Sequence, residues 1–216
     1  MESAPQHHRE GIQELLDKAY DEGHRDNVAM KEGEVVEERV GHMDDKEMHG
    51  KSSQERTLSF LRDRGYLDTS FEGKEIHHLV VESLSKKEAF DRYCSSGRTS
   101  VWDGLEENMP YMTPEGTTLD VMIMKFNKVI GSDEAITEMA TLGVRPLTYE
   151  ELIQYGIAYP THQEKDAFNG LGSKHTFENG NVLTPRLVLS GGYRVLCANS
   201  WDSDWSEWCR FPVVRK

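Results

Sequence analysis

The sequence is poor in cysteine, and its three cysteines do not suggest a disulfide framework. Cys94, Cys197 and Cys209 leave one thiol over in any pairing, and no C-x-x-C motif is present among the 216 residues. This usage is typical of buried thiols in a reducing compartment. We therefore expect reduced cysteines and a cytoplasmic location.

Long apolar runs are also lacking. No segment approaches the ~18 consecutive apolar residues of a transmembrane helix. The first 30 residues are charged throughout and contain no apolar core of a signal peptide. The sequence thus predicts a chain without a membrane partner.

Basic charge is scarce as well. The chain has 25 Lys and Arg against 38 Asp and Glu, which gives a net charge of -13. Residues 1–118 hold 15 basic and 26 acidic residues, a balance of -11, whereas residues 119–216 hold 10 and 12, a balance of -2. A protein that binds nucleic acid by neutralising phosphates needs a basic face. We therefore expect no nucleic-acid partner.

The chain divides into four parts. Residues 1–51 combine sparse apolar residues with many acidic ones, a composition typical of a largely disordered tail. Residues 52–94 predict a helical hairpin, and residues 95–118, rich in Gly, Pro and Ser, predict a linker loop. Residues 119–216 predict a small α+β domain.

Capping residues define the predicted hairpin. Ser53 precedes the apolar side of a first helix, and Gly65 stands where that helix should end. Thr69 and Glu72 spell a capping box, after which apolar residues at helical spacing run to near Tyr93. We therefore expect two helices with facing apolar sides.

The last part mixes strand and helix signals. The apolar run 119–126 predicts a buried strand, and Ser132 marks the start of a helix. Thr148 and Glu151 spell a second capping box, and Asn179–Gly180 is typical of a hairpin turn. The fold class is therefore α+β with a mainly antiparallel sheet. Strands are expected at 174–178, 182–189, 193–198 and 209–214.

Nine histidines raise the question of a metal site. His77 and His78 are adjacent, so on the predicted helix they point about 100° apart, one to the core and the other to solvent. No H-E-x-x-H motif or i, i+4 histidine pair is present. We therefore expect no metal and no cofactor. The weaker groupings are the tail residues His42, Asp44, Asp45, Glu47 and His49, and the set Cys197, Cys209 and His175.

Signatures of nucleophilic catalysis are absent too. The sequence contains neither a G-x-S-x-G elbow nor a G-x-x-x-x-G-K-[ST] phosphate loop. An alternative function remains open, that of a small hydrolase or transferase. Its site would lie among Cys94, His162, His175 and Asp202.

The segment 200–210, SWDSDWSEWCR, is the densest signal in the chain. Tryptophans interleaved with carboxylates are typical of a surface that binds a ligand or partner. The alternative is a loop that caps the core and buries one or two of the tryptophans. We expect a non-enzymatic binding module in which Trp205 is partly exposed. The predicted contact residues are Trp201, Asp202, Asp204, Trp205, Glu207 and Trp208.

Several short motifs in residues 119–216 carry a resemblance. They are IGSDE at 130–134, RPLTYEEL at 145–152, LGS at 171–173, and the ending with Trp205, CRF at 209–211 and VRK at 214–216. In this order they resemble an uncharacterised family of small bacterial proteins from candidate phyla. The family implies no activity, and the resemblance does not extend to residues 1–118.

A more distant similarity concerns the fold. RPLTYEELIQ at 145–154 is similar to the start of a helix in formylglycine-generating-enzyme-like domains, a branch of the C-type-lectin-like folds. Trp201, Asp202, Cys209 and Phe211 resemble the terminal strand of a lectin domain. The glutamate, proline and asparagine triplet of the lectin calcium site is absent, as is the second disulfide. The resemblance therefore implies a lectin-like fold, whereas the missing triplet and disulfide argue against calcium and sugar binding.

Overall fold

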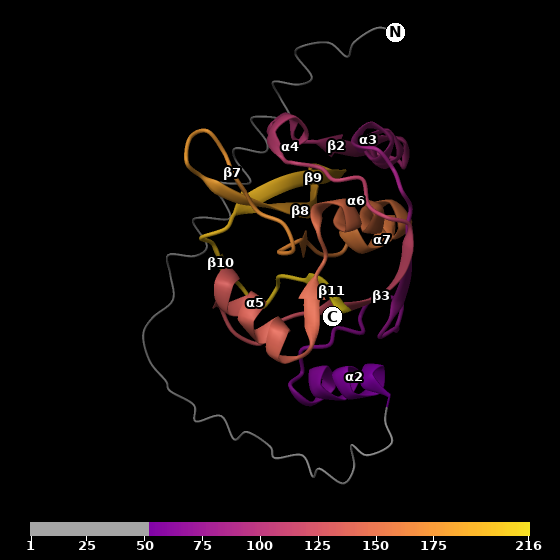
Figure 1. Cartoon of the computed structure of the whole chain (residues 1–216), viewed down its shortest axis with the longest axis vertical. Helices are drawn as coiled ribbons and strands as arrows, with labels where there is room; N and C mark the ends of the chain where they lie inside the picture. The colour runs from indigo at the N-terminus through magenta and orange to yellow at the C-terminus, as the bar shows by residue number, and fades with distance from the viewer. Residues whose placement is uncertain (1–51) are drawn as a thin grey trace, which may run out of the picture. The chain divides into compact units, whose positions relative to one another are not determined.

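A computed structural model describes residues 52–216. They form an α+β fold, as the sequence predicts, with two main sheets and helices packed against them (Figure 1). The predicted acidic tail lies outside the described residues.

The first sheet is antiparallel, and its central part is buried on both faces. Its order is β1-β3-β11-β5, so the C-terminal strand β11 lies in the interior of the sheet. Along β3, Val121 and Ile123 pack into one apolar core, whereas Met122 and Met124 pack into the other. This follows from the period of two in a strand, and it explains why the segment reads as a continuous apolar run. The bounds are β1 His77–Val81, β3 Thr117–Met124, β5 Val144–Pro146 and β11 Phe211–Arg215.

The second sheet has the order β2-β9-β8-β6, with β7 paired to β8. The long strands β8 and β9 form a hairpin that reverses at Gly191 and Gly192, whose φ angles are 56° and 79°. Positive φ is accessible to glycine at little cost, which suits a two-residue turn. The strands β4 and β10 form a separate two-stranded antiparallel sheet. The bounds are β2 Thr99–Val101, β6 Phe168–Asn169, β7 His175–Thr176, β8 Val182–Ser190, β9 Tyr193–Ser200, β4 Ile130–Gly131 and β10 Asp204–Trp205.

Side-chain caps fix where three of the helices begin. Ser52, Ser85 and Thr148 each accept a hydrogen bond from the backbone of the glutamate three residues on, and each of these glutamates bonds back to the cap. Such boxes satisfy two of the backbone donors that a helix start leaves free. Helices α6 and α7 lie against the second sheet, and α5 lies beside β5 (Figure 1). The bounds are α2 Ser53–Asp63, α3 Lys86–Ser95, α4 Asp103–Asn108, α5 Ser132–Thr141, α6 Tyr149–Ala158 and α7 Pro160–Gln163.

The predicted helical hairpin over residues 52–94 is wrong in its second half. Residues 77–81 form the strand β1, with side chains alternately buried and exposed, and pair with β3. The helix begins only at Lys86, because its capping box is Ser85 with Glu88 rather than Thr69 with Glu72. Because β1 and β3 share one sheet, this part of the chain is not separate from the predicted α+β domain.

The predicted linker over residues 95–118 is also more structured than expected. It contains β2 and α4. Leu105 and Met109 are buried in the core, and β2 extends the second sheet through a parallel pairing with β9. Burial of these apolar side chains ties the segment to the fold, despite its Gly and Pro content.

Candidate functional site

Three side chains from distant parts of the sequence converge beside the first sheet. Glu72 comes from the turn before β1, His77 from the start of β1, and His162 from α7. One donor atom of each lies within 4.8 Å of the others. Within residues 52–216, no other group of three or more His, Cys, Asp or Glu side chains is placed to share one ion.

Local structure explains why both histidines point inward. The alternation along β1 buries His77 and exposes His78, whose side chain contacts Asp120 instead. Pro160 starts α7 directly after α6, which turns His162 back into the core. One histidine of the adjacent pair thus faces the core and the other faces solvent, as predicted. The two side chains point in opposite directions because they lie on a strand, however, and not on the predicted helix.

The imidazoles are enclosed by aromatic rings. The His162 ring stacks on Tyr159 with 5.0 Å between centroids and lies 5.0 Å from Phe71. The His77 and His162 rings meet edge to face at 4.8 Å. His77 is 2% exposed and His162 only 1%, so water does not solvate either ring.

Buried histidine nitrogens without partners mark this cluster. Neither ring nitrogen of His77 has a hydrogen-bond partner, and Nε2 of His162 has none either. Nδ1 of His162 is bound to Tyr155 Oη at 2.7 Å. A buried polar atom left unsatisfied costs about 1–3 kcal/mol. The arrangement therefore costs stability that a ligand for these nitrogens would recover.

Glu72 completes the cluster from the solvent side. Its Oε1 lies 3.7 Å from His162 Nε2, and its Oε2 accepts a hydrogen bond from Lys74 Nζ at 2.7 Å. Glu72 has a φ of 55° and is the one residue other than glycine with positive φ in the described part of the chain. Such a conformation costs about 1–3 kcal/mol and persists where the surroundings enforce it, often at functional sites.

Burial and charge set the protonation states. Burial, reinforced by the neighbouring His77, lowers the pKa of His162 to about 4, and burial likewise lowers the pKa of His77. The hydrogen bond from Lys74 lowers the pKa of Glu72. At neutral pH the cluster therefore presents two uncharged imidazoles and one carboxylate, which are the forms that bind metal ions.

The spacing suits a metal ion of small radius. Ligands about 2.0–2.1 Å from a tetrahedral zinc ion lie about 3.3 Å from one another. The Glu72 to His162 separation of 3.7 Å is close to this value. The widest separation between two ligand atoms of the cluster is within 4.8 Å. A side-chain shift of at most about 1.5 Å would bring these two atoms to the spacing of zinc ligands.

Two of the three tryptophans in segment 200–210 are buried. Trp205 is 1% exposed and donates its Nε1–H to Ser132 Oγ at 2.9 Å. Trp201 is 8% exposed, and Lys174 lies over its ring at 4.2 Å. The expectation that Trp205 is partly exposed is therefore wrong, because its indole fills the core beneath β11. Trp208 is 69% exposed, and the exposed carboxylates of the segment are Asp202, Asp204 and Glu207.

The residues of the alternative enzyme site are not brought together. His162 belongs to the cluster described above, and none of Cys94, His175 and Asp202 joins it. Cys94 is an exposed residue at the end of α3, and partial desolvation of its thiol, together with the negative charges of Glu106 and Asp91, raises its pKa. Burial raises the pKa of Cys197 to about 11, so neither thiol is activated as a nucleophile. The set Cys197, Cys209 and His175 does not converge on one point either.

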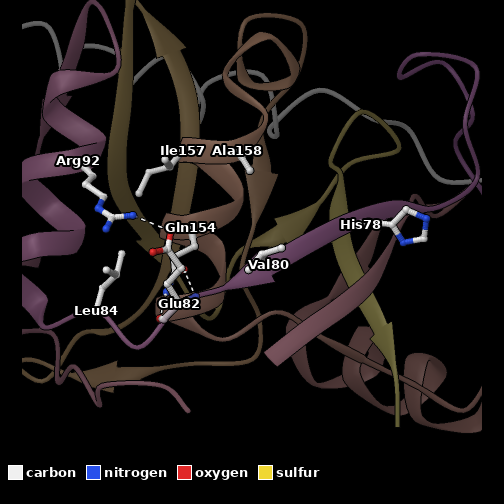
Figure 2. Close-up of a pocket in the computed structure, with 8 residues that line it drawn as sticks. All are labelled: His78, Val80, Glu82, Leu84, Arg92, Gln154, Ile157 and Ala158. Atoms are coloured by element: carbon white, nitrogen blue, oxygen red, sulfur yellow. Dashed lines mark hydrogen bonds and ion pairs between the residues drawn. The ribbon is translucent and has the colours of Figure 1, made fainter. Parts of the chain in front are cut away.

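A hollow of about 300 Å³ lies beside the edge strand β1 (Figure 2). Its polar groups bind one another: Arg92 pairs with Glu82 at 2.6 Å, and the Gln154 amide bonds the backbone N–H and C=O of Glu82. Figure 2 shows Val80 on the strand and His78 at the far end, pointing away. The hollow therefore presents no uncommitted polar group comparable to the buried histidines. Its other lining residues are Leu84, Ile157 and Ala158.

Comparison of the chain with protein-family models, curated proteins and solved structures gave no match. The resemblances to a bacterial family and to lectin-like folds therefore stay predictions. No helix within residues 52–216 is long and apolar enough to cross a membrane.

Proposed function

We propose that this protein binds a divalent transition-metal ion through Glu72, His77 and His162, with Zn²⁺ as the first candidate. The observation that carries the proposal is the pair of buried histidines whose nitrogens lack partners and face a carboxylate. Sequence motifs do not indicate this site, because its two histidines lie far apart in the chain, one in β1 and the other in α7.

The protonation states favour a bound metal ion over an ion pair between His162 and Glu72. A protonated His162 paired with Glu72 would also satisfy Nε2, but the pKa of His162 near 4 keeps the imidazole neutral at pH 7. A metal ion instead uses the neutral imidazole, since it binds the lone pair. In that tautomer Nδ1–H of His162 donates to Tyr155 Oη, the kind of second-shell contact that orients histidine ligands.

The donor set selects among metals. Two imidazoles and one carboxylate suit Zn²⁺, Fe²⁺, Co²⁺ and similar ions. Ca²⁺ and Mg²⁺ prefer sets made wholly of oxygen ligands, and this cluster supplies them with only one carboxylate.

Zinc titration of the chelator-treated full chain tests the proposal. We expect one equivalent of Zn²⁺ by calorimetry, lost in His77→Gln and in His162→Gln. His78→Gln is the matched control, because this exposed histidine neighbours His77 without joining the cluster. Tyr155→Phe should weaken binding about 10–100-fold, the usual cost of losing a second-shell partner. Absence of stoichiometric binding, or equal loss in His78→Gln, would refute the proposal.

A second candidate function is the interaction module that the sequence predicts, now centred on Trp208. The observation in its favour is that this large indole is 69% exposed beside three exposed carboxylates, and exposed tryptophans are enriched in interfaces. On this hypothesis the protein is a non-enzymatic cytoplasmic module without a nucleic-acid partner. A pull-down with wild type and Trp208→Ala tests it, and equal capture by both contradicts it.

A further inference from the structure

The proposed metal site has an incomplete set of protein ligands. Glu72, His77 and His162 supply three donors, and no fourth His, Cys, Asp or Glu of residues 52–216 joins them. Structural zinc sites are closed by four protein ligands, whereas sites with three keep a position for an exchangeable ligand. An ion bound here would therefore retain at least one open coordination position.

The open position is accessible from one direction. The two histidines are almost fully buried, whereas 40% of the Glu72 side chain is exposed. Tyr159 and Phe71 cover the imidazole rings. An external ligand can consequently approach the ion only from the side of Glu72.

The charged side chains that act on the two histidines are two lysines, Lys74 and Lys165, and one carboxylate, Glu72. Lys165 is exposed, lies 6.0 Å above the Phe71 ring, and has no carboxylate partner within residues 52–216. Lys74 is bound to Glu72 Oε2. Both cations act on the histidines, since Lys165 lowers the pKa of His162 and Lys74 that of His77, whereas Glu72 is the one carboxylate that acts on either. With a divalent ion in place, the approach carries a net positive charge.

We infer that the metal-loaded site binds an oxyanion, a carboxylate or phosphate group of a small ligand, at the open position, with Lys165 contacting its outer oxygens. This inference rests on the proposed metal site. Negative oxygen donors satisfy the divalent ion and the ammonium group together, which a neutral ligand cannot do.

Cobalt provides the probe, because the visible spectrum of Co²⁺ reports on its coordination. The full chain is loaded with Co²⁺ and titrated separately with inorganic phosphate and with acetate at constant ionic strength, with chloride as the control. We expect a saturable spectral change with phosphate or acetate, and the two arms show which group is preferred. In Lys165→Gln the affinity for the anion should fall about fivefold while Co²⁺ binding is retained, the upper range for an exposed charge pair. Lys128→Gln is the matched control, since this exposed lysine pairs with Glu134 elsewhere on the surface.

The outcomes separate this inference from the proposed function. If Co²⁺ binds but neither anion changes the spectrum, or if Lys165→Gln and Lys128→Gln bind the anion equally, the inference is refuted and the metal site stands. If Co²⁺ and Zn²⁺ fail to bind wild type, both the metal site and the inference are refuted.

Discussion

The two buried histidines should make the metal-free protein lose stability as the pH falls from 7.5 to 5. His162 has a pKa of about 4 in the folded chain against 6.5 for an ordinary histidine. The unfolded chain therefore binds a proton at pH 5 that the folded chain does not, and the free energy of unfolding rises with pH in this window. Stability is fully present above pH 6.5 and is lost progressively down to pH 4.

The magnitude follows from the two pKa values. Between pH 7.5 and pH 5, protonation of His162 in the unfolded chain costs about 2 kcal/mol of stability. His77, whose pKa is lowered by burial as well, adds a loss of the same sign. Most carboxylates remain ionised at pH 5, so histidines dominate the window.

Urea denaturation at the two pH values, with chelator present, measures the effect. The difference in unfolding free energy between pH 7.5 and pH 5 should shrink by about 2 kcal/mol in His162→Gln, whereas His78→Gln should keep the full difference. Comparison with wild type cancels the contribution of other titrating groups. If His162→Gln does not fold, His77→Gln serves as the second variant, with a smaller difference expected. An unchanged pH dependence in both cluster variants would refute the assignment of neutral, buried histidines.

Three further predictions concern strain and packing. Glu72→Gly should raise the stability of the metal-free protein by about 1 kcal/mol relative to Glu72→Ala, because glycine adopts the φ of 55° without strain; equal stability of the two variants in urea would contradict this. Trp205→Ala should lower the unfolding free energy by about 3–5 kcal/mol, since this indole is 1% exposed. Trp208→Ala should change the unfolding free energy by less than about 0.5 kcal/mol, and similar losses of stability for the two variants in thermal melts would contradict this prediction. Phe211→Ala should also cost about 3–5 kcal/mol, because its ring is 0% exposed, and a melting temperature close to wild type would contradict that.

Signals that span only a few residues predicted their elements well. The box of Thr148 and Glu151 starts α6, and Gly180 takes the positive φ of 84° expected in its turn. The apolar run 119–126 coincides with most of the interior strand β3, which ends two residues earlier, at Met124. Each depends on neighbours in the chain, because capping, pleating and turn geometry are local properties.

The error in the helical hairpin shows where local pattern stops being decisive. The apolar residues from Ile76 to Leu84 fit a helix by spacing, and the short apolar run from Leu79 to Val81 equally fits a strand. Pairing with β3 decides for the strand, and the helix starts later at Ser85. Secondary structure in this segment therefore depends on a partner that lies far along the chain.

The sequence by itself determined the α+β class, the apolar run that forms β3, and the positions of several caps and turns. It also determined which residue types were present for chemistry. Only the tertiary structure decided which of these residues meet. It places His77 beside His162 and Glu72, and it buries Trp205 against Ser132. Caps and turns follow from interactions a few residues apart, whereas a site and a core are built from contacts between segments whose distance in sequence carries no information about their distance in space.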